Sequence, residues 1–391
     1  MSPKGYSLSY YILCVVALLA MFSTTLINPL LSIFAKEIGA TGIWIGLAVA
    51  AYWVSRIILE IPSGILSSKY GYYPPMLIGL VLTAVGTAVC IYVSDPFQLI
   101  LGRALQGLGA PLFFAVSMTF IVNLFPIERR GGAMGIFQGI EYFGSILGST
   151  FSGIIITAFS FKGSFLLSTI LVVIGIIVIV APRRIRTESR AQPRTASFSL
   201  SSLSKVFWNK TLMIVSIATL AEWIMSSGAL YTVFPLYANE SLGFSLSEIG
   251  LFMGARSVGY VAAILGMGYI ADKIGRRPVL IFGLAGTAIM IVSLSFVSSF
   301  LGIIAVVSIL GITTGAIWII CPVLAAEAVD PSLRGAAIGV YRTFFDLGSI
   351  LGPIIMTWVF SINGIALCFY LSGALLFLNL LSSLSLKETK S

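Results

Sequence analysis

Long apolar stretches separated by short polar breaks follow one another along almost the entire chain. A helix needs about 20 apolar residues to cross a bilayer core of about 30 Å, because each residue advances it by about 1.5 Å. The first stretch is longer than the ~7–15-residue core of a cleaved signal peptide, so we expect it to be a spanning helix. The alternating segments of ~10 residues that form transmembrane barrels are missing. The pattern predicts an all-α integral membrane protein with twelve spans, roughly over residues 10–34, 43–66, 74–93, 97–124, 133–158, 163–182, 210–236, 247–270, 278–297, 301–325, 335–360 and 364–385.

One polar break is much longer than the others. It runs from Arg183 to about Asn209 and is rich in Arg and Ser, which is typical of a flexible linker. A plain linker is favoured over a regulatory segment. The sequence therefore predicts a six-helix bundle over residues 1–182, a cytoplasmic linker over 183–209 and a second six-helix bundle over 210–391.

The basic residues between the spans set the orientation. With the N-terminus inside, 17 Lys and Arg residues fall on the cytoplasmic side, and Lys36 and Lys162 fall on the other. Cytoplasmic loops carry an excess of Lys and Arg. We therefore expect a multi-pass protein of the plasma (cytoplasmic) membrane with both termini in the cytoplasm.

The composition supports a membrane protein and removes several classes of chemistry. The chain is 58% hydrophobic and 9% charged, whereas a soluble domain has roughly a quarter of its residues charged. The net charge of +9 lies in the cytoplasmic loops, so no nucleic-acid partner is expected. Without His, paired Cys, a GxSxG elbow or a phosphate-binding loop, the chain lacks the residues of an enzyme or an ATP-driven pump. We expect no metal and no cofactor.

The two halves of the chain repeat each other at an offset of 204 residues. The sequence G-S-I-L-G of Gly144–Gly148 recurs at Gly348–Gly352, and R-G-G-A-M-G from Arg130 aligns with R-G-A-A-I-G from Arg334. Six spans, an even number, separate the copies. The halves are therefore a parallel repeat, related by an axis along the membrane normal.

Three motifs resemble those of the major facilitator superfamily. The segment Gly268–Pro278 resembles its signature loop between helices 8 and 9, and Leu101–Gly109 resembles its helix 4 motif. Gly135, Gly144 and Gly148 resemble the helix 5 glycines of its drug:proton antiporters. The resemblance implies a secondary transporter that works by alternating access, with gating residues at Gly64, Lys69, Gly71, Gly268, Asp272, Lys273, Gly275, Arg276 and Arg277.

Some positions depart from these motifs. In the first half Ser68 replaces the acid of the signature loop, and Tyr72 and Tyr73 replace basic residues. Ser149 replaces the proline expected on helix 5, whereas the second half keeps Pro353. These departures weaken the prediction of antiport.

Eight charged residues lie inside the predicted spans. Each costs at least ~2.5–3.5 kcal/mol on insertion scales, so we expect a function and a partner for it. Cross-domain ion pairs are predicted from the spacing of these charges along their helices, from their similar depth in the membrane, and from the helix neighbours that the resemblance implies. The alternative is a local pair one turn apart within each helix. The predicted cross-domain pairs are Arg56–Asp346, Glu60–Arg342 and Glu141–Arg256.

Glu222 is left without an obvious partner in this scheme. A buried carboxylate favours its neutral form, which suits reversible proton binding. Glu222 is therefore the first candidate for proton coupling, with Asp346 second and Glu141 also considered. The alternative is a protonated or solvated glutamate that lines the cavity. By resemblance, Arg103 belongs to proton coupling or to helix packing.

The central cavity is expected to be aromatic, which suits efflux of amphipathic or lipophilic compounds. The four arginines in spans favour a competing substrate class, an organic anion, and uptake of an anion or sugar is the alternative. A different class is a non-transporting sensor on the same scaffold. The expected partners are a small-molecule substrate, protons and the lipid bilayer, with the protein a monomer. Candidate cavity aromatics are Tyr52, Trp53, Phe113, Phe114, Trp223, Tyr231, Trp318, Tyr341 and Phe345.

Overall fold

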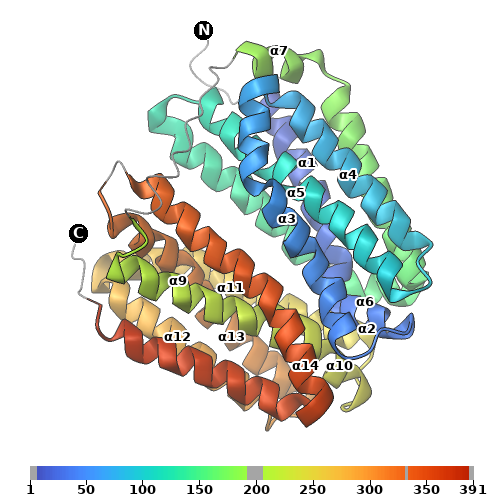
Figure 1. The fold of residues 1–391 in the computed structure, drawn as a ribbon, viewed down its shortest axis with the longest axis vertical. Helices are drawn as coiled ribbons and strands as arrows, with labels where there is room; N and C mark the ends of the chain where they lie inside the picture. Colours follow the sequence, from blue (N-terminus) through green and yellow to red (C-terminus); the bar gives the residue numbers. More distant parts are fainter. Residues whose placement is uncertain (1–6, 192–205, 331–332, 387–391) are drawn as a thin grey trace. The chain divides into compact units, whose positions relative to one another are not determined.

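The computed structural model describes residues 7–191, 206–330 and 333–386, and its long elements are helices (Figure 1). Ten helices in this part of the chain are long and apolar enough to cross a membrane. Two of the ten, α6 (Ile127–Val180) and α14 (Arg334–Ser383), are each interrupted by a residue with left-handed φ. These residues are Ser160, in the predicted break between residues 158 and 163, and Gly364, 204 residues later, which is the first residue of the last predicted span. The prediction of twelve spans is thus confirmed.

The chain forms two compact units. The first consists of Met1–Asn28, Glu37–Gly39 and Ala51–Ser197, and the second of Pro29–Lys36, Ala40–Ala50 and Phe198–Ser391. The first contains α1 (Leu8–Ile27), α4 (Tyr73–Ile91), α5 (Pro96–Leu124), α6 and most of α3 (Ile43–Tyr70). The second contains α9 (Lys210–Trp223), α10 (Phe234–Glu240), α11 (Leu246–Ile274), α12 (Arg276–Ser293), α13 (Phe300–Glu327) and α14.

Small residues set equivalent helix contacts in the two units. A Cβ on Gly107 of α5 would overlap the carbonyl oxygen of Tyr52 on α3. A Cβ on Gly311 of α13 would overlap the carbonyl oxygen of Arg256 on α11 in the same way. Glycine lets these helix backbones approach closely inside a membrane, where apolar side chains alone do not drive association. The repeat seen in the sequence is therefore a repeat of packing.

The first and seventh spans are not the continuous α-helices that we expected. The first consists of α1, a 3-10 turn η1 (Asn28–Leu30) and α2 (Leu31–Glu37). The seventh consists of α9, a ten-residue π-helix η2 (Ile224–Val233) and α10. Interrupted helices at corresponding positions of two halves commonly mark the binding site of a transporter.

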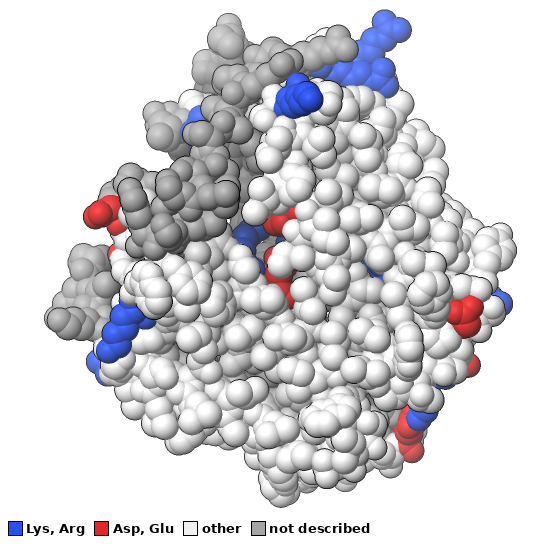
Figure 2. Space-filling view, viewed as in Figure 1, with Lys and Arg blue, Asp and Glu red and all other residues white. Residues whose placement is uncertain are grey.

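Large apolar side chains cover much of the described surface. Leu265 is 78% exposed and Leu301 is 77% exposed, both on spanning helices. Figure 2 shows a face on which residues other than Lys, Arg, Asp and Glu predominate. Such a surface is suited to contact with lipid.

The beginning of the predicted linker is helical, not flexible. Residues Arg183–Ala191 form α7, whose Ile185 is fully buried in the core of the first unit. The Oγ of Ser189 accepts hydrogen bonds from the backbone N–H groups of Tyr72 and Tyr73, over 2.8 and 2.9 Å. Residues 192–205 of the predicted linker lie outside the described residues.

Candidate functional site

A buried polar network lies in the second unit where α9, η2 and α11 meet. The hydroxyl of Ser226 donates to Oε1 of Glu222 over 2.7 Å and accepts from Nη2 of Arg256 over 3.2 Å. Nη1 of Arg256 donates to the hydroxyl of Tyr231. Glu222 is 4% exposed and Arg256 is 5% exposed, so the network is shielded from solvent. The expectation that Glu222 lacks a partner is wrong.

Aromatic rings add to the stabilisation of the Arg256 cation. The centre of its guanidinium lies 4.9 Å from the ring centroid of Tyr231 and 5.7 Å from that of Tyr260. Cations over aromatic faces gain most when they are desolvated. Arg256 is thus held inside the second unit. Its predicted pairing with Glu141, which is itself buried, stays a prediction.

The π-helix determines which residues of the seventh span face this network. A Cβ on Gly144 would overlap the carbonyl oxygen of Leu18, and a Cβ on its counterpart Gly348 would overlap the carbonyl oxygen of Leu220. Leu220 lies 202 residues further along the chain than Leu18. At the far ends of these spans, Lys36 and Glu240 lie 204 residues apart and form an exposed ion pair of 2.6 Å. Between these two points the seventh span therefore contains two more residues than the first, 20 against 18.

The width of the π-helix explains where the extra residues go. A π turn closes i→i+5 instead of i→i+4, so each turn holds about one more residue than an α turn. The 10 residues of η2 make about two such turns. Such segments are frequent at functional sites. Ser226 and Tyr231 both belong to η2, so both partners of Arg256 are presented by this widened segment.

An aromatic cluster begins directly beside Glu222. The ring of Trp223 lies 4.3 Å from that of Phe345 and 6.0 Å from that of Trp318, measured between centroids. Trp318 and Phe345 are 5.6 Å apart. Three of the predicted cavity aromatics therefore meet at one place. Tyr341, also predicted, is buried in α14.

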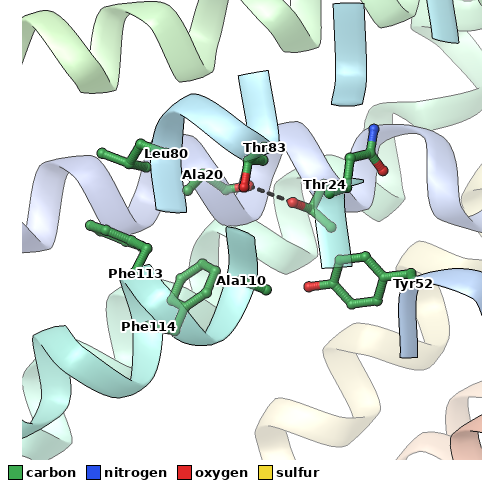
Figure 3. A pocket seen from close by; sticks show the side chains of 9 residues that line it. Ala20, Thr24, Tyr52, Leu80, Thr83, Ala110, Phe113 and Phe114 are labelled. Carbon is green, nitrogen blue, oxygen red and sulfur yellow. Dashed lines mark hydrogen bonds between the residues drawn. The ribbon is translucent and has the colours of Figure 1, made fainter. Parts of the chain in front are cut away.

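A small cavity of about 10 Å³, room for about one water molecule, lies in the first unit (Figure 3). Tyr52, Phe113 and Phe114 line this small cavity, and their place in a central substrate cavity stays a prediction. Trp53 is not among the lining residues and instead faces Arg56, whose guanidinium lies 5.2 Å from its ring. The lining side chains are Ala20, Thr24, Tyr52, Leu80, Thr83, Gln106, Ala110, Phe113 and Phe114.

Arg103 lies behind the wall of this cavity. Its Nη1 donates to Oε1 of Gln106 over 2.7 Å, and its guanidinium lies 5.1 Å from the ring centroid of Tyr52. The Nε2 of Gln106 donates to Thr87 over 3.0 Å. Sequence analysis missed Thr24 and Ser226, because an uncharged polar residue in a span gives no signal until its neighbours are known, and it assigned no role to Gln106 although this residue lies in the helix 4 motif.

The other charges in spans are placed as follows. Arg56 and Glu60 form an ion pair of 3.5 Å on α3, which is the local alternative to a cross-domain pair. Asp346 is 3% exposed within α14, on which Arg342 also lies. Cross-domain pairing of these four residues stays a prediction.

The signature loop of the second unit contains an ion-pair network. Nη2 of Arg276 lies 2.9 Å from Oε1 of Glu327, and Nη1 of Arg276 lies 4.0 Å from Oδ1 of Asp272. Arg277 donates to the carbonyl of Leu384 over 2.6 Å, just after α14. The ammonium of Lys273 lies over the ring of Tyr269 at 4.3 Å. The loop thereby connects the ends of α11, α13 and α14.

The corresponding loop of the first unit uses different residues. Lys69 lies over the ring of Tyr70 at 5.2 Å, and Arg186 of α7 lies over the ring of Tyr73 at 4.9 Å. Gly71 and its counterpart Gly275 both have left-handed φ, of 84° and 97°. A Cβ on Gly64 or on Gly268 would meet nothing within 4 Å, so these two glycines are not required by close packing.

Within the described residues, no group of three or more His, Cys, Asp or Glu side chains is arranged to hold a metal ion. The site therefore consists of hydrogen-bonding groups, buried charges and aromatic rings. Such a set binds an organic molecule by shape, charge and apolar contact.

Comparisons with known proteins agree with this architecture. A family model described as Major Facilitator Superfamily matches residues 13–227 and 223–391. An uncharacterized MFS-type transporter of Methanocaldococcus jannaschii is 22% identical and covers 91% of this chain and 92% of its own. A multidrug resistance protein of Proteus mirabilis is 24% identical and covers 92% of this chain and 90% of its own.

Two solved structures have a similar fold. A bacterial homolog of the human lysosomal transporter Spinster, inward-facing and unoccupied, has a TM-score of 0.81 at 13% identity and covers 96% of both chains. The human organic anion transporter MFSD10 has a TM-score of 0.68 at 15% identity, covering 96% of this chain and 98% of that one. At these identities the likeness concerns the fold.

Proposed function

Because the chain belongs to the Major Facilitator Superfamily and is a multi-pass membrane transporter, not an enzyme, we propose that it exports a small amphipathic compound by alternating access, driven by a proton gradient. The observation that carries this proposal is the buried network of Glu222, Ser226 and Arg256 at the π-helix. We place the protein in the plasma membrane with both termini in the cytoplasm, following the distribution of its basic residues.

The charges in the network support proton coupling. With Glu222 ionised, its negative charge balances Arg256 through the shared hydroxyl of Ser226. A proton on Glu222 removes that balance and leaves Arg256 as an uncompensated buried cation, which is unfavourable. Protonation thus favours a rearrangement of η2 against α11. A carboxylate that exchanges its proton as the helices move couples proton transfer to helix movement.

The aromatic cluster beside Glu222 supports an amphipathic substrate. Trp223, Trp318 and Phe345 offer a large apolar surface one residue away from the titrating group. Bulky apolar solutes bind such surfaces by burial of area. Export is supported by relatives named as multidrug resistance proteins, in Proteus mirabilis and in Bacillus subtilis.

The signature loops and the cross-domain pairs are the gating elements of the proposal. Ion pairs of Arg276 with Glu327 and Asp272 stabilise one arrangement of the cytoplasmic helix ends, and their release permits another. Arg56–Asp346, Glu60–Arg342 and Glu141–Arg256 would form and break as the halves rock. Cysteine cross-linking at positions 56/346 and 141/256 is expected to depend on substrate and pH, and equal yields in all conditions would remove these pairs.

Transport in proteoliposomes tests the proposal. Purified protein is expected to move an amphipathic fluorescent compound when a pH gradient is imposed, and Glu222→Gln is expected to abolish the response to the gradient while allowing exchange without it. Glu240→Gln, which removes a carboxylate from an exposed ion pair, is the matched control. Equal flux with and without the gradient in the unaltered protein would contradict proton coupling, and full gradient-driven flux in Glu222→Gln would remove Glu222 from the mechanism.

A further inference from the structure

Helix α7 is a short basic helix that is fixed to the first unit. Four of its nine residues are Arg and one is Glu. Its Ile185 is buried in the core of that unit, and the hydroxyl oxygen of Ser189 accepts two backbone N–H groups at the start of α4. Figure 1 shows α7 across one end of the helices of this unit. The helix therefore holds its side chains in a definite orientation, which a flexible linker does not.

The exposed face of α7 is strongly basic. Arg183, Arg184 and Arg186 are all exposed. Nε of Arg184 lies 2.7 Å from Oε1 of Glu188, the one carboxylate that the sequence of the helix contains. None of the ion pairs in the described part of the chain includes Arg183 or Arg186. The guanidinium of Arg186 instead lies over the ring of Tyr73, at 4.9 Å. The face therefore keeps an excess of positive charge.

The end of α6 leads directly to this basic face, and one side of it is apolar and exposed. Ile170, Ile174 and Ile177 are 47%, 41% and 59% exposed. Because residues three and four apart lie on the same side of a helix, these side chains form one strip, about 10 Å long at a rise of about 1.5 Å per residue. Only two residues separate the end of α6 from the start of α7. This α6 strip therefore ends close to the arginines.

An anionic phospholipid matches both parts of this surface. Its phosphate group carries a negative charge and oxygen acceptors, which a guanidinium binds through parallel N–H donors. Its acyl chains are apolar and suit the isoleucines of the α6 strip. Basic groups next to a spanning helix attract anionic lipids, and each raises the affinity about fivefold. Three exposed arginines against one carboxylate on a fixed helix are therefore enough for a preference of about tenfold or more over a neutral lipid.

We propose that the exposed face of α7 binds the phosphate group of an anionic phospholipid, whose acyl chain lies along the α6 strip. Arg183, Arg184 and Arg186 hold the headgroup. Because Ser189 on the buried side of α7 accepts the N–H groups at the start of α4, a bound lipid also stabilises this contact. The surface lies apart from the network of Glu222, and it does not depend on which solute the protein moves.

Native mass spectrometry of the purified full-length protein in a neutral detergent tests the proposal. The probes are dioleoylphosphatidylglycerol and dioleoylphosphatidylcholine, which have the same acyl chains and differ in net charge. The first molecule of phosphatidylglycerol is expected to bind about tenfold or more tightly than the first of phosphatidylcholine. Glycerol 3-phosphate, which has the charged group but no acyl chain, is expected not to displace it. Equal affinities of the two lipids, or displacement by glycerol 3-phosphate at the same concentration, would overturn the proposal.

Two variants with opposite expected effects assign the preference to α7. Arg183→Gln combined with Arg186→Gln removes two exposed cations and is expected to weaken phosphatidylglycerol binding about tenfold or more. Glu188→Gln removes the carboxylate beside Arg184 and is expected to strengthen it about fivefold. The second variant keeps every arginine, so it decides the question if the first loosens α7. Unchanged binding in Glu188→Gln, or in a double variant whose amides at the start of α4 stay protected from hydrogen exchange, would overturn the assignment.

The matched control removes the same number of positive charges from other helices. Lys162 of α6 and Lys210 of α9 are both exposed, as the arginines of α7 are. Lys162→Gln combined with Lys210→Gln is expected to keep the preference for phosphatidylglycerol. An equal loss of binding in this control and in the double variant of α7 would show that the preference comes from the overall charge of the protein, and would overturn the proposal.

Discussion

Glu222 and Arg256 meet through one hydroxyl group, that of Ser226, which donates to the carboxylate over 2.7 Å and accepts from the guanidinium over 3.2 Å. The two charges therefore share a neutral group instead of forming a direct ion pair. When the carboxylate gains a proton, the hydroxyl can accept a hydrogen bond from it while it still accepts from Arg256, because a hydroxyl has two acceptor sites and a guanidinium only donates. This arrangement lets the charge state of Glu222 act on Arg256 without a large movement of either side chain.

The first prediction concerns this hydroxyl. Ser226→Ala keeps both charges but removes the group between them, so gradient-driven transport is expected to fall by about tenfold, the effect of losing ~1.4 kcal/mol of coupling. Ser226→Thr keeps the hydroxyl and is expected to restore most of the rate. Uptake into proteoliposomes under a fixed pH gradient measures both variants. A Ser226→Ala protein with unchanged uptake would show that the hydroxyl has no part in coupling.

The second prediction concerns the ion pair of Arg276 and Glu327. Its side chains are 15% and 31% exposed, so Glu327→Gln is expected to cost less than about 1 kcal/mol of stability. We expect Glu327→Gln to change conformation instead, by loosening the signature loop Gly268–Pro278. A single cysteine introduced into this loop is then expected to be labelled faster. Asp272→Asn, which affects a longer contact of 4.0 Å, is expected to change labelling less. An equal effect of the two variants would argue against a specific role of Glu327.

The third prediction concerns the breaks within α6 and α14. Ser160 has φ of 61° and ψ of 173°, a region that is costly for any residue other than glycine. Ser160→Gly is expected to stabilise the protein by about 1 kcal/mol, since the capping contact from Gly163 N–H to its hydroxyl is long, at 3.4 Å. Gly364→Ala at the equivalent break, with φ of 72°, is expected to destabilise the protein by a similar amount. Thermal unfolding in detergent would show shifts of opposite sign, and shifts of the same sign would contradict this account.

The fourth prediction concerns the contact of α7 with the first signature loop. Ser189→Ala leaves the N–H groups of Tyr72 and Tyr73 without their acceptor in a buried place, which is expected to cost about 1–3 kcal/mol. Thr187→Ala is the control, because Thr187 is on the same helix, is exposed and bonds only the carbonyl of Arg184. Hydrogen exchange of the amides at the start of α4 is expected to rise in the first variant alone. Equal protection in both variants would show that α7 does not stabilise the loop.

The apolar pattern of the chain was sufficient for the fold. Span length depends on local composition, so the breaks near Ser160 and Gly364 could be placed to within a few residues, and the repeat followed from direct alignment. Asp272 and Arg276, which we propose as gating residues, were recognisable from the resemblance of their loop to a family motif, because the motif is local to one loop. The carboxylate Glu222 was found from its cost inside a membrane, a property of the residue alone.

The partners of these residues were decided by tertiary structure. Ser226 reaches Arg256 because it lies on the π-helix η2, where the seventh span contains two more residues than the matching part of the first span. Each inserted residue rotates the side chains that follow it by about a quarter of a turn around the helix axis. Ser and Gln are common in spans, so neither Ser226 nor Gln106 stood out before its neighbours were known. The sequence by itself determined which segments cross the membrane, since that depends on composition over short windows. It did not determine which of their charges are buried, because Arg342 is exposed while Asp346, on the same helix, is buried. Only the packing of the helices decided that Ser226 links Glu222 to Arg256 in one half, while none of the ion pairs among the described residues includes Arg103 in the other, because that depends on which side chains distant segments bring together.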